Sequence, residues 1–197
     1  MTTPGTARDR AKAERTDAIL SAAAEQFAAR GYSGVSLEDI GTAVGVSGPA
    51  VYRHFAGKQA LLGALLIGVS ERLVSGGLDV ASGTDPGMER MRALVEFHAA
   101  FAIGNADVIR VQDRDLPYLG DEGRADVRRL QRSYIELWID ALGALVDEGR
   151  DALRLRVQAC FGLLNSTPHS TSSTQRAHDD TTHLLTAMAL AALLAVD

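Results

Sequence analysis

The chain has 197 residues, of which 46% are hydrophobic and 23% charged, a composition typical of a globular protein with its own hydrophobic core. A single cysteine, Cys160, excludes an intrachain disulfide. We recognise no signal peptide, and the longest uncharged apolar run, 184–196, is too short to cross a bilayer. We therefore expect a cytoplasmic protein with no membrane segment.

The formal net charge of −5 is unevenly distributed. Residues 1–60 contain seven of the 20 basic residues and six of the 25 acidic residues, so this part carries +1 and the remainder −6. A surface that binds nucleic acid is therefore expected only at the N-terminal end, with the acidic mass held away from phosphate.

Apolar residues at helical spacing and the lack of any strand pattern predict an all-α fold of about nine helices. Residues 1–11 are polar and indicate a flexible arm. Two segments rich in Gly, Ser, Thr, Asp or Pro, 76–87 and 167–176, are expected to be loops. Helices are expected at about 12–30, 36–44, 47–56, 58–75, 86–104, 105–115, 121–148, 150–166 and 178–196.

The segment from Ser36 to Lys58 predicts two short helices joined by a tight turn, which after helix 12–30 make a helix-turn-helix. Ser36 is a good N-cap with Asp39 three residues later. Ala43 and Gly45 are small enough to let the two helices cross closely. The crossing angle is expected to be fixed by apolar side chains: Ile40, Val44, Val46, Val51 and Phe55. The outer face of the second short helix is expected to carry Gly48, Pro49, Ala50, Tyr52, Arg53 and His54.

These motifs closely resemble those of the tetracycline-repressor family of transcriptional regulators over residues 12–66. The shared motifs are A-x-x-x-F at 23–27, G-Y at 31–32, S-L-E-D-I at 36–40, A-V-G-V-S at 43–47 and V-Y-R-H-F-x-x-K at 51–58. The resemblance implies a DNA-binding domain over 12–57 and a ligand-binding and dimerisation domain over 58–197.

The resemblance also implies a role for each residue of the reading head. Ser36 would contact a phosphate, and Ser47, Gly48, Pro49 and Ala50 would enter the major groove. Tyr52, His54 and Lys58 would bind backbone phosphates, and Arg53 would reach a base edge or a phosphate. Taken singly, Tyr52 could instead be a half-buried packing residue and His54 an ordinary surface histidine. The N-terminal basic residues could track the minor groove or form a solvated arm: Arg8, Arg10, Lys12 and Arg15.

The family resemblance further implies a homodimer whose two heads read a palindromic operator. The last two helices are the expected interface, although the run 184–196 could also be an ordinary core helix. A ligand pocket is expected between 86–115 and 121–148, although its residues could equally be plain core. Its expected lining is Phe97, His98, Phe101, Val108, Tyr134 and Trp138, with Asn165 as a polar contributor.

The sequence therefore predicts a ligand-responsive repressor that a small hydrophobic effector, such as an acyl-CoA or a fatty acid, releases from DNA. The alternatives are an activator of the same fold, or a helical ligand-binding protein whose DNA-binding head is vestigial. We expect no enzyme and no cofactor, because the chain has no Gly-rich phosphate loop, H-E-x-x-H motif or nucleophile elbow. No metal site is expected at His169, His178 and His183, because only the last two could share a helix and their spacing is poor.

Overall fold

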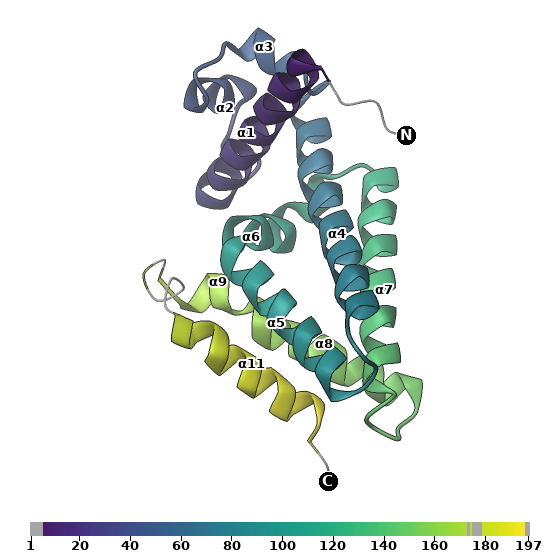
Figure 1. The fold of residues 1–197 in the computed structure, drawn as a ribbon. Helices are drawn as coiled ribbons and strands as arrows, with labels where there is room; N and C mark the ends of the chain where they lie inside the picture. The colour runs from purple at the N-terminus through teal and green to yellow at the C-terminus, as the bar shows by residue number, and fades with distance from the viewer. Residues whose placement is uncertain (1–5, 173, 175–178, 196–197) are drawn as a thin grey trace.

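The computed structural model describes residues 6–172, 174 and 179–195, and these residues form helices and turns without a strand, which confirms the all-α prediction. Figure 1 shows the first three helices as a separate head, joined to the other helices by the long helix α4. The helices are α1 (Ala7–Arg30), α2 (Leu37–Ala43), α3 (Gly48–Tyr52), α4 (Lys58–Gly83), α5 (Met88–Gly104), α6 (Ala106–Asp115), the 3₁₀ turn η1 (Leu116–Tyr118), α7 (Asp121–Leu142), α8 (Arg150–Asn165), α9 (Thr167–Ser170) and α11 (Asp179–Leu193).

The first helix begins earlier than predicted. Thr6 caps α1, because its Oγ1 accepts from the Asp9 N–H at 3.2 Å while the Asp9 carboxylate accepts from the Thr6 N–H at 3.0 Å. This reciprocal pair satisfies two amide groups that a helix start leaves open. The prediction of a flexible arm over 1–11 is therefore wrong for residues 7–11, and residues 1–5 lie outside the described part. Ser36 and Asp39 form the same box at the start of α2, as predicted.

The fourth helix extends through part of the segment predicted as a loop. It continues past Ser75 to Gly83, which leaves only residues 84–87 to connect it to α5. A β-carbon on Gly77 would lie 2.7 Å from Cε2 of Tyr134 and 2.9 Å from Cδ2 of Leu137, and Gly76 faces the ring of Phe97. These glycines therefore allow α5 and α7 to pack closely on α4, rather than breaking the helix.

Two clusters of buried side chains form the core, and α4 contributes to both. The first holds the head against the start of α4 and against α6, with Ile19, Phe27 and Leu61 among its fully buried members. The second joins α5, α7, α8 and α11 around Trp138. Among the described helices, α4 alone is long and apolar enough to span a membrane by length and composition, and its buried leucines belong to the first cluster.

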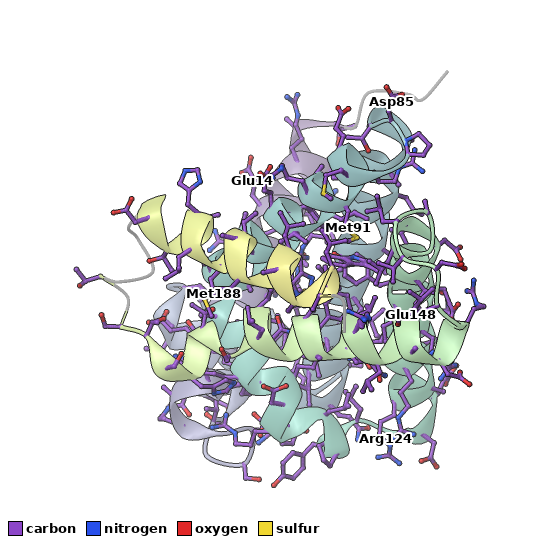
Figure 2. All side chains as sticks on the ribbon, turned by 90° about the horizontal axis from the view of Figure 1, so that it is seen from below. Glu14, Asp85, Met91, Arg124, Glu148 and Met188 are labelled. Carbon is purple, nitrogen blue, oxygen red and sulfur yellow. The ribbon has the colours of Figure 1, made fainter. Side chains whose placement is uncertain are left out.

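The C-terminal part follows the predicted order with shorter elements. Helix α7 ends at Leu142 rather than near residue 148, and a turn follows it before α8 begins. The segment predicted as a loop at 167–176 contains the four-residue helix α9, in which Pro168 occupies the first turn. Helix α11 packs beside α8, as Figure 2 shows from below.

Candidate DNA-binding surface and effector cavity

The turn between α2 and α3 places the two helices in close contact. A β-carbon on Gly41 would lie 2.9 Å from the carbonyl oxygen of Val46 and 3.2 Å from Cγ2 of Val51, so Gly41 is the point of close approach. Ala43 and Gly45, which were predicted to allow this close crossing, do not lie at the contact. Gly45 has open space around it but adopts a φ of 69°, which a glycine accepts without strain, and Ala43 is exposed.

Most of the residues expected to contact DNA are on the exposed side of the head. Ser36, Ser47, Pro49, Tyr52 and Arg53 are exposed, while Ala50 and His54 are half-buried. Tyr52 is 53% exposed, so about half of its surface is available for a contact outside the head.

Gly48 departs from the expected arrangement. It is buried, and a β-carbon there would lie 3.0 Å from Cγ of Glu38, so this position packs on α2 instead of facing outward.

Several polar groups of the head are also engaged within the protein. The Ser36 hydroxyl accepts the cap bond from Asp39, and Nδ1 of His54 lies 3.0 Å from Oγ1 of Thr16 on α1. The Lys58 ammonium donates to the carbonyls of Tyr32 and Val35 at 2.9 Å each and lies 4.4 Å from the centre of the Tyr32 ring. Lys58 therefore fixes the start of α4 against the head and keeps one of its three N–H donors for another acceptor.

The basic residues near the N-terminus belong to α1, not to an arm. Arg8, Arg10 and Lys12 are exposed on its first turns, and Arg15 donates to the Val44 carbonyl at 3.3 Å, beyond the end of α2. A helix holds these charges at fixed spacing on the outside of the head.

Hydrogen bonds and one ring stack join the head to the end of α6 and to the 3₁₀ turn. The Arg114 guanidinium donates to the carbonyls of Phe27 and Ala28 at the end of α1, and to the buried carboxylate of Asp115. Tyr118 stacks on Tyr32 with ring centres 4.7 Å apart. Because charged donors make strong hydrogen bonds, Arg114 ties the two parts of the chain firmly.

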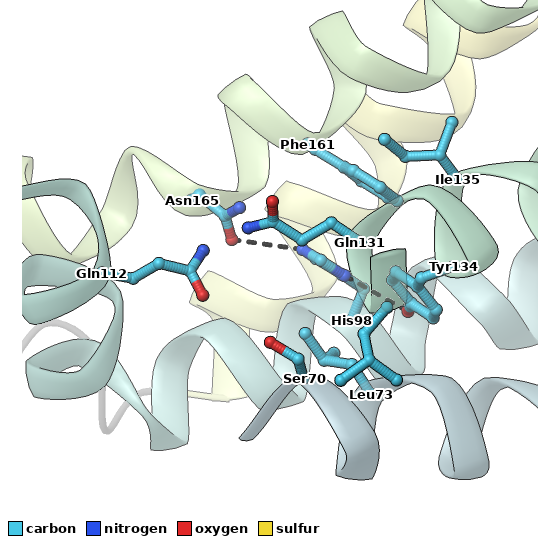
Figure 3. A pocket seen from close by; sticks show the side chains of 10 residues that line it. Ser70, Leu73, His98, Gln112, Gln131, Tyr134, Ile135, Phe161 and Asn165 are labelled. Atoms are coloured by element: carbon cyan, nitrogen blue, oxygen red, sulfur yellow. Dashed lines mark hydrogen bonds between the residues drawn. The ribbon is translucent and has the colours of Figure 1, made fainter. Parts of the chain in front are cut away.

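A cavity of about 180 Å³ lies among the helices below the head. Five helices contribute to its wall: α4, α5, α6, α7 and α8. Figure 3 shows apolar side chains and amide groups lining the same space. The lining residues are Ser70, Leu73, His98, Gln112, Leu130, Gln131, Tyr134, Ile135, Phe161 and Asn165.

His98 lies at the centre of a hydrogen-bonded chain in this wall. Its Nε2 is 3.1 Å from Oδ1 of Asn165, and its Nδ1 is 3.3 Å from the hydroxyl oxygen of Tyr134. A neutral imidazole satisfies both contacts when Nε2–H donates to Asn165 and Tyr134 donates to Nδ1. Burial lowers the pKa of His98 from 6.5 to about 4, against the opposing effect of the Asn165 hydrogen bond. Burial likewise raises the pKa of Tyr134.

Three of the seven residues predicted for the pocket line the cavity, namely His98, Tyr134 and Asn165. Trp138 lies behind them, fully buried, with its ring edge-on to His98 at 5.8 Å. The other three predicted residues do not line this cavity: the ring of Phe97 packs on Gly76, while Phe101 and Val108 belong to the core around the head.

Seven lining residues were missed by sequence reasoning: Ser70, Leu73, Gln112, Leu130, Gln131, Ile135 and Phe161. Four lining residues of α7 form two adjacent pairs, 130–131 and 134–135, separated by one helical turn. That spacing is a signal that the sequence carried. The contributions from α4 and α6 depend on packing between distant segments.

No cluster of three or more His, Cys, Asp or Glu side chains that could hold a metal ion occurs among the described residues. His169 lies 3.0 Å from the Asp113 carboxylate, and His183 is exposed on α11. His178 lies outside the described residues. Cys160 is buried, and burial raises the pKa of its thiol to about 12.

Both parts of the chain match known families. Residues 19–65 match the family described as "Bacterial regulatory proteins, tetR family", and residues 84–169 match "Tetracyclin repressor-like, C-terminal domain". The chain is 27% identical over 168 residues to the HTH-type transcriptional repressor KstR2 of Rhodococcus jostii, covering 85% of this chain and 82% of KstR2. It is 39% identical over 83 residues to the HTH-type transcriptional activator FasR of Mycolicibacterium smegmatis, covering 42% of this chain and 38% of FasR.

The fold is also that of solved regulators. The transcriptional regulator FadR from Bacillus subtilis, solved in complex with stearoyl-CoA, superposes with a TM-score of 0.71 at 16% identity, covering 91% of this chain and 98% of FadR. The helix-turn-helix of the head and the helical domain that follows it thus agree with the motif resemblance and with both family matches. The chain therefore belongs to the tetracycline-repressor family of bacterial regulatory proteins.

Proposed function

We propose that this chain is a transcriptional repressor that binds a palindromic operator and is released when an effector enters the cavity described above. The observation that carries this proposal is the path of α4. The helix starts in the head at Lys58, which is bonded to Tyr32 and Val35, and its residues Ser70 and Leu73 form part of the cavity wall. A ligand that shifts α4 therefore acts directly on the support of the DNA-binding helices.

The direction of control is inferred from the extent of similarity to the named relatives. KstR2 is named a repressor and FasR an activator, and both are similar to this chain. We favour repression because the similarity to KstR2 extends over most of both chains, whereas that to FasR covers less than half of either. Activation is the second candidate.

Dimerisation through α8 and α11 is supported by apolar side chains left in solvent. Leu155 on α8 is 68% exposed, and Leu184 and Met188 on α11 are 61% and 47% exposed. The two helices lie side by side in Figure 2, where Met188 projects from α11. An apolar surface of this kind favours a partner, and a twofold dimer would give two reading heads for the two halves of a palindrome.

The effector is proposed to bind in the cavity, and the protein is proposed to act in the cytoplasm, where its operator is. A long-chain acyl-CoA has one support, the likeness to FadR in complex with stearoyl-CoA, and that likeness concerns the fold alone. The chemistry of the cavity wall is the better guide to the effector.

Fluorescence anisotropy of the purified protein with labelled DNA from upstream of its own gene tests the regulator. We expect binding that weakens steeply as salt rises, because phosphate contacts release counterions. Replacing Tyr52 and Arg53 by Ala should abolish binding, whereas Arg132→Ala on the exposed side of α7 serves as a control for lost charge and should bind like wild type. Equal binding by the double variant and wild type would overturn the proposal. Once binding to the operator is established, a reporter gene separates repression from activation.

A further inference from the structure

Three side-chain amides border the cavity without a full set of hydrogen bonds. Gln112 comes from α6, Gln131 from α7 and Asn165 from α8, and Figure 3 shows their amide groups around the same space. Within the described part of the chain, neither glutamine amide has a hydrogen-bond partner, and Asn165 uses its Oδ1 for His98. A carboxamide offers two N–H donors and one acceptor oxygen. The cavity therefore presents directional hydrogen-bonding groups to whatever enters it.

The wall carries no formal charge. Among the residues that the structure describes, no Lys, Arg, Asp or Glu side chain lines the cavity, and the titratable groups there are His98 and Tyr134. Burial keeps the imidazole of His98 and the phenol of Tyr134 neutral near pH 7. A carboxylate or phosphate in this space would lose part of its water without gaining a counter-charge, which is costly. The wall therefore favours a ligand whose buried part is uncharged.

The size and shape of the cavity favour one ring. An apolar cavity of about 150 Å³ accepts benzene, whereas pockets for drug-sized ligands span about 300–1,000 Å³. The 180 Å³ here suits a ring with a few substituent atoms and is small for a long acyl chain. The Phe161 ring, which stacks on His98 at 4.6 Å and 3°, gives the wall a flat, rigid apolar surface.

We propose that the effector is a compact, uncharged ring compound bearing a carboxamide, carbonyl or hydroxyl group that hydrogen-bonds the amides of Gln112, Gln131 and Asn165. This inference rests on the proposed function and specifies its ligand class. Because Oδ1 of Asn165 accepts from His98, the free group of Asn165 is its NH₂ donor. The ligand atom that meets Asn165 is therefore an acceptor oxygen, such as that of a carbonyl.

Four probes distinguish this class from its competitors. Benzamide is an uncharged ring with a carbonyl and an N–H group, benzoate has the same shape with a charge, and ethylbenzene has no hydrogen-bonding group. Stearoyl-CoA represents the acyl class. Binding to the full chain is followed by the fluorescence of Trp138, the sole tryptophan, whose ring is edge-on to Phe161 with ring centres 4.8 Å apart.

We expect benzamide to bind saturably and at least about tenfold more tightly than benzoate or ethylbenzene, the ratio that one or two hydrogen bonds supply. Gln131→Leu and Gln112→Leu should each weaken benzamide binding about three- to tenfold. Arg132→Ala, which removes a polar group next to Gln131 but outside the cavity, should leave it unchanged.

Tighter binding of ethylbenzene or stearoyl-CoA than of benzamide would overturn the inference, as would no benzamide binding or unchanged binding in both glutamine variants. Two variants at separate helices guard against one that fails to fold. The proposed function is tested independently of this ligand class, because the affinity for upstream DNA is measured without any probe. A chain that binds its DNA and is released by stearoyl-CoA would keep the function and lose this ligand class.

Discussion

Gln112 and Arg114 are two residues apart on α6, and they serve different parts of the molecule. Gln112 lines the cavity, while Arg114 donates to the carbonyls of Phe27 and Ala28 at the end of α1. Because α6 is one continuous helix, a proposed ligand that moved α6 at Gln112 would also move Arg114 and its contact with the head. This route to the head is separate from the one through α4.

Arg114→Ala is expected to destabilise the fold. The change removes the donors to two carbonyls of α1 and leaves the carboxylate of Asp115, which is 1% exposed, without its cation. We expect the free energy of unfolding to fall by about 1–3 kcal/mol, as for a buried polar group that loses its partner. Urea unfolding measures the change, and the exposed control Arg132→Ala should stay within about 0.5 kcal/mol of wild type. Equal stability of the two variants would show that Arg114 adds nothing.

The buried imidazole of His98 predicts a loss of stability in mild acid. Its pKa is about 4 in the folded chain and 6.5 as a free group, so the unfolded chain takes up the proton first as pH falls. The resulting loss of folding stability is nearly absent above pH 6.5 and grows as pH falls from 6.5 to about 4. It reaches roughly 2 kcal/mol at pH 5. Urea unfolding at pH 7 and pH 5, at one protein concentration, should show this loss in wild type and not in His98→Gln. The same pH dependence in both proteins would contradict it.

Gly41 and Gly68 should respond oppositely to the same substitution. A methyl group on Gly41 would meet the Val46 carbonyl at 2.9 Å, whereas on Gly68 it would have only the flexible end of Arg72 at 3.8 Å. Gly41→Ala should therefore cost about 1–3 kcal/mol and weaken DNA binding, because α3 is forced away from α2. Gly68→Ala, within α4, should instead stabilise the helix by about 0.5–1 kcal/mol. Thermal unfolding and DNA anisotropy test both, and a neutral Gly41→Ala would contradict the close approach.

The order of the helices could be predicted from the sequence because each helix carries its own local signals. Ser36 and Asp39 fix the start of α2, and Gly31, with a φ of 78°, ends α1 as expected. The prediction of a loop at 76–87 was wrong for residues 76–83, because glycines such as Gly76 and Gly77 can either weaken a helix or allow close packing on it. Glycine weakens an isolated helix, yet it also admits the rings of Phe97 and Tyr134 against α4, and tertiary packing decided the outcome.

The site was predicted less completely than the fold, and the reason is again tertiary. Sequence spacing could assign exposed positions of the head, such as Tyr52 and Arg53, from the motif alone. It could not place Lys58, whose bonds to Tyr32 and Val35 depend on how α4 meets the head. Aromatic residues were favoured for the pocket, but the amides of Gln112 and Gln131 line it because α6 and α7 converge there.

The exposed leucines of α8 and α11 predict where a dimer can be broken. If α8 and α11 pair with their copies, a charge at Leu184 would be buried without a partner, so Leu184→Glu should give a monomer. Leu78 on α4 is a matched control, since it is 52% exposed and lies on neither helix, and Leu78→Glu should leave the dimer intact. Sedimentation velocity distinguishes the two states. The monomer should also bind a palindrome far more weakly, because it offers one recognition helix where the dimer offers two. A Leu184→Glu protein that remains dimeric would place the interface elsewhere.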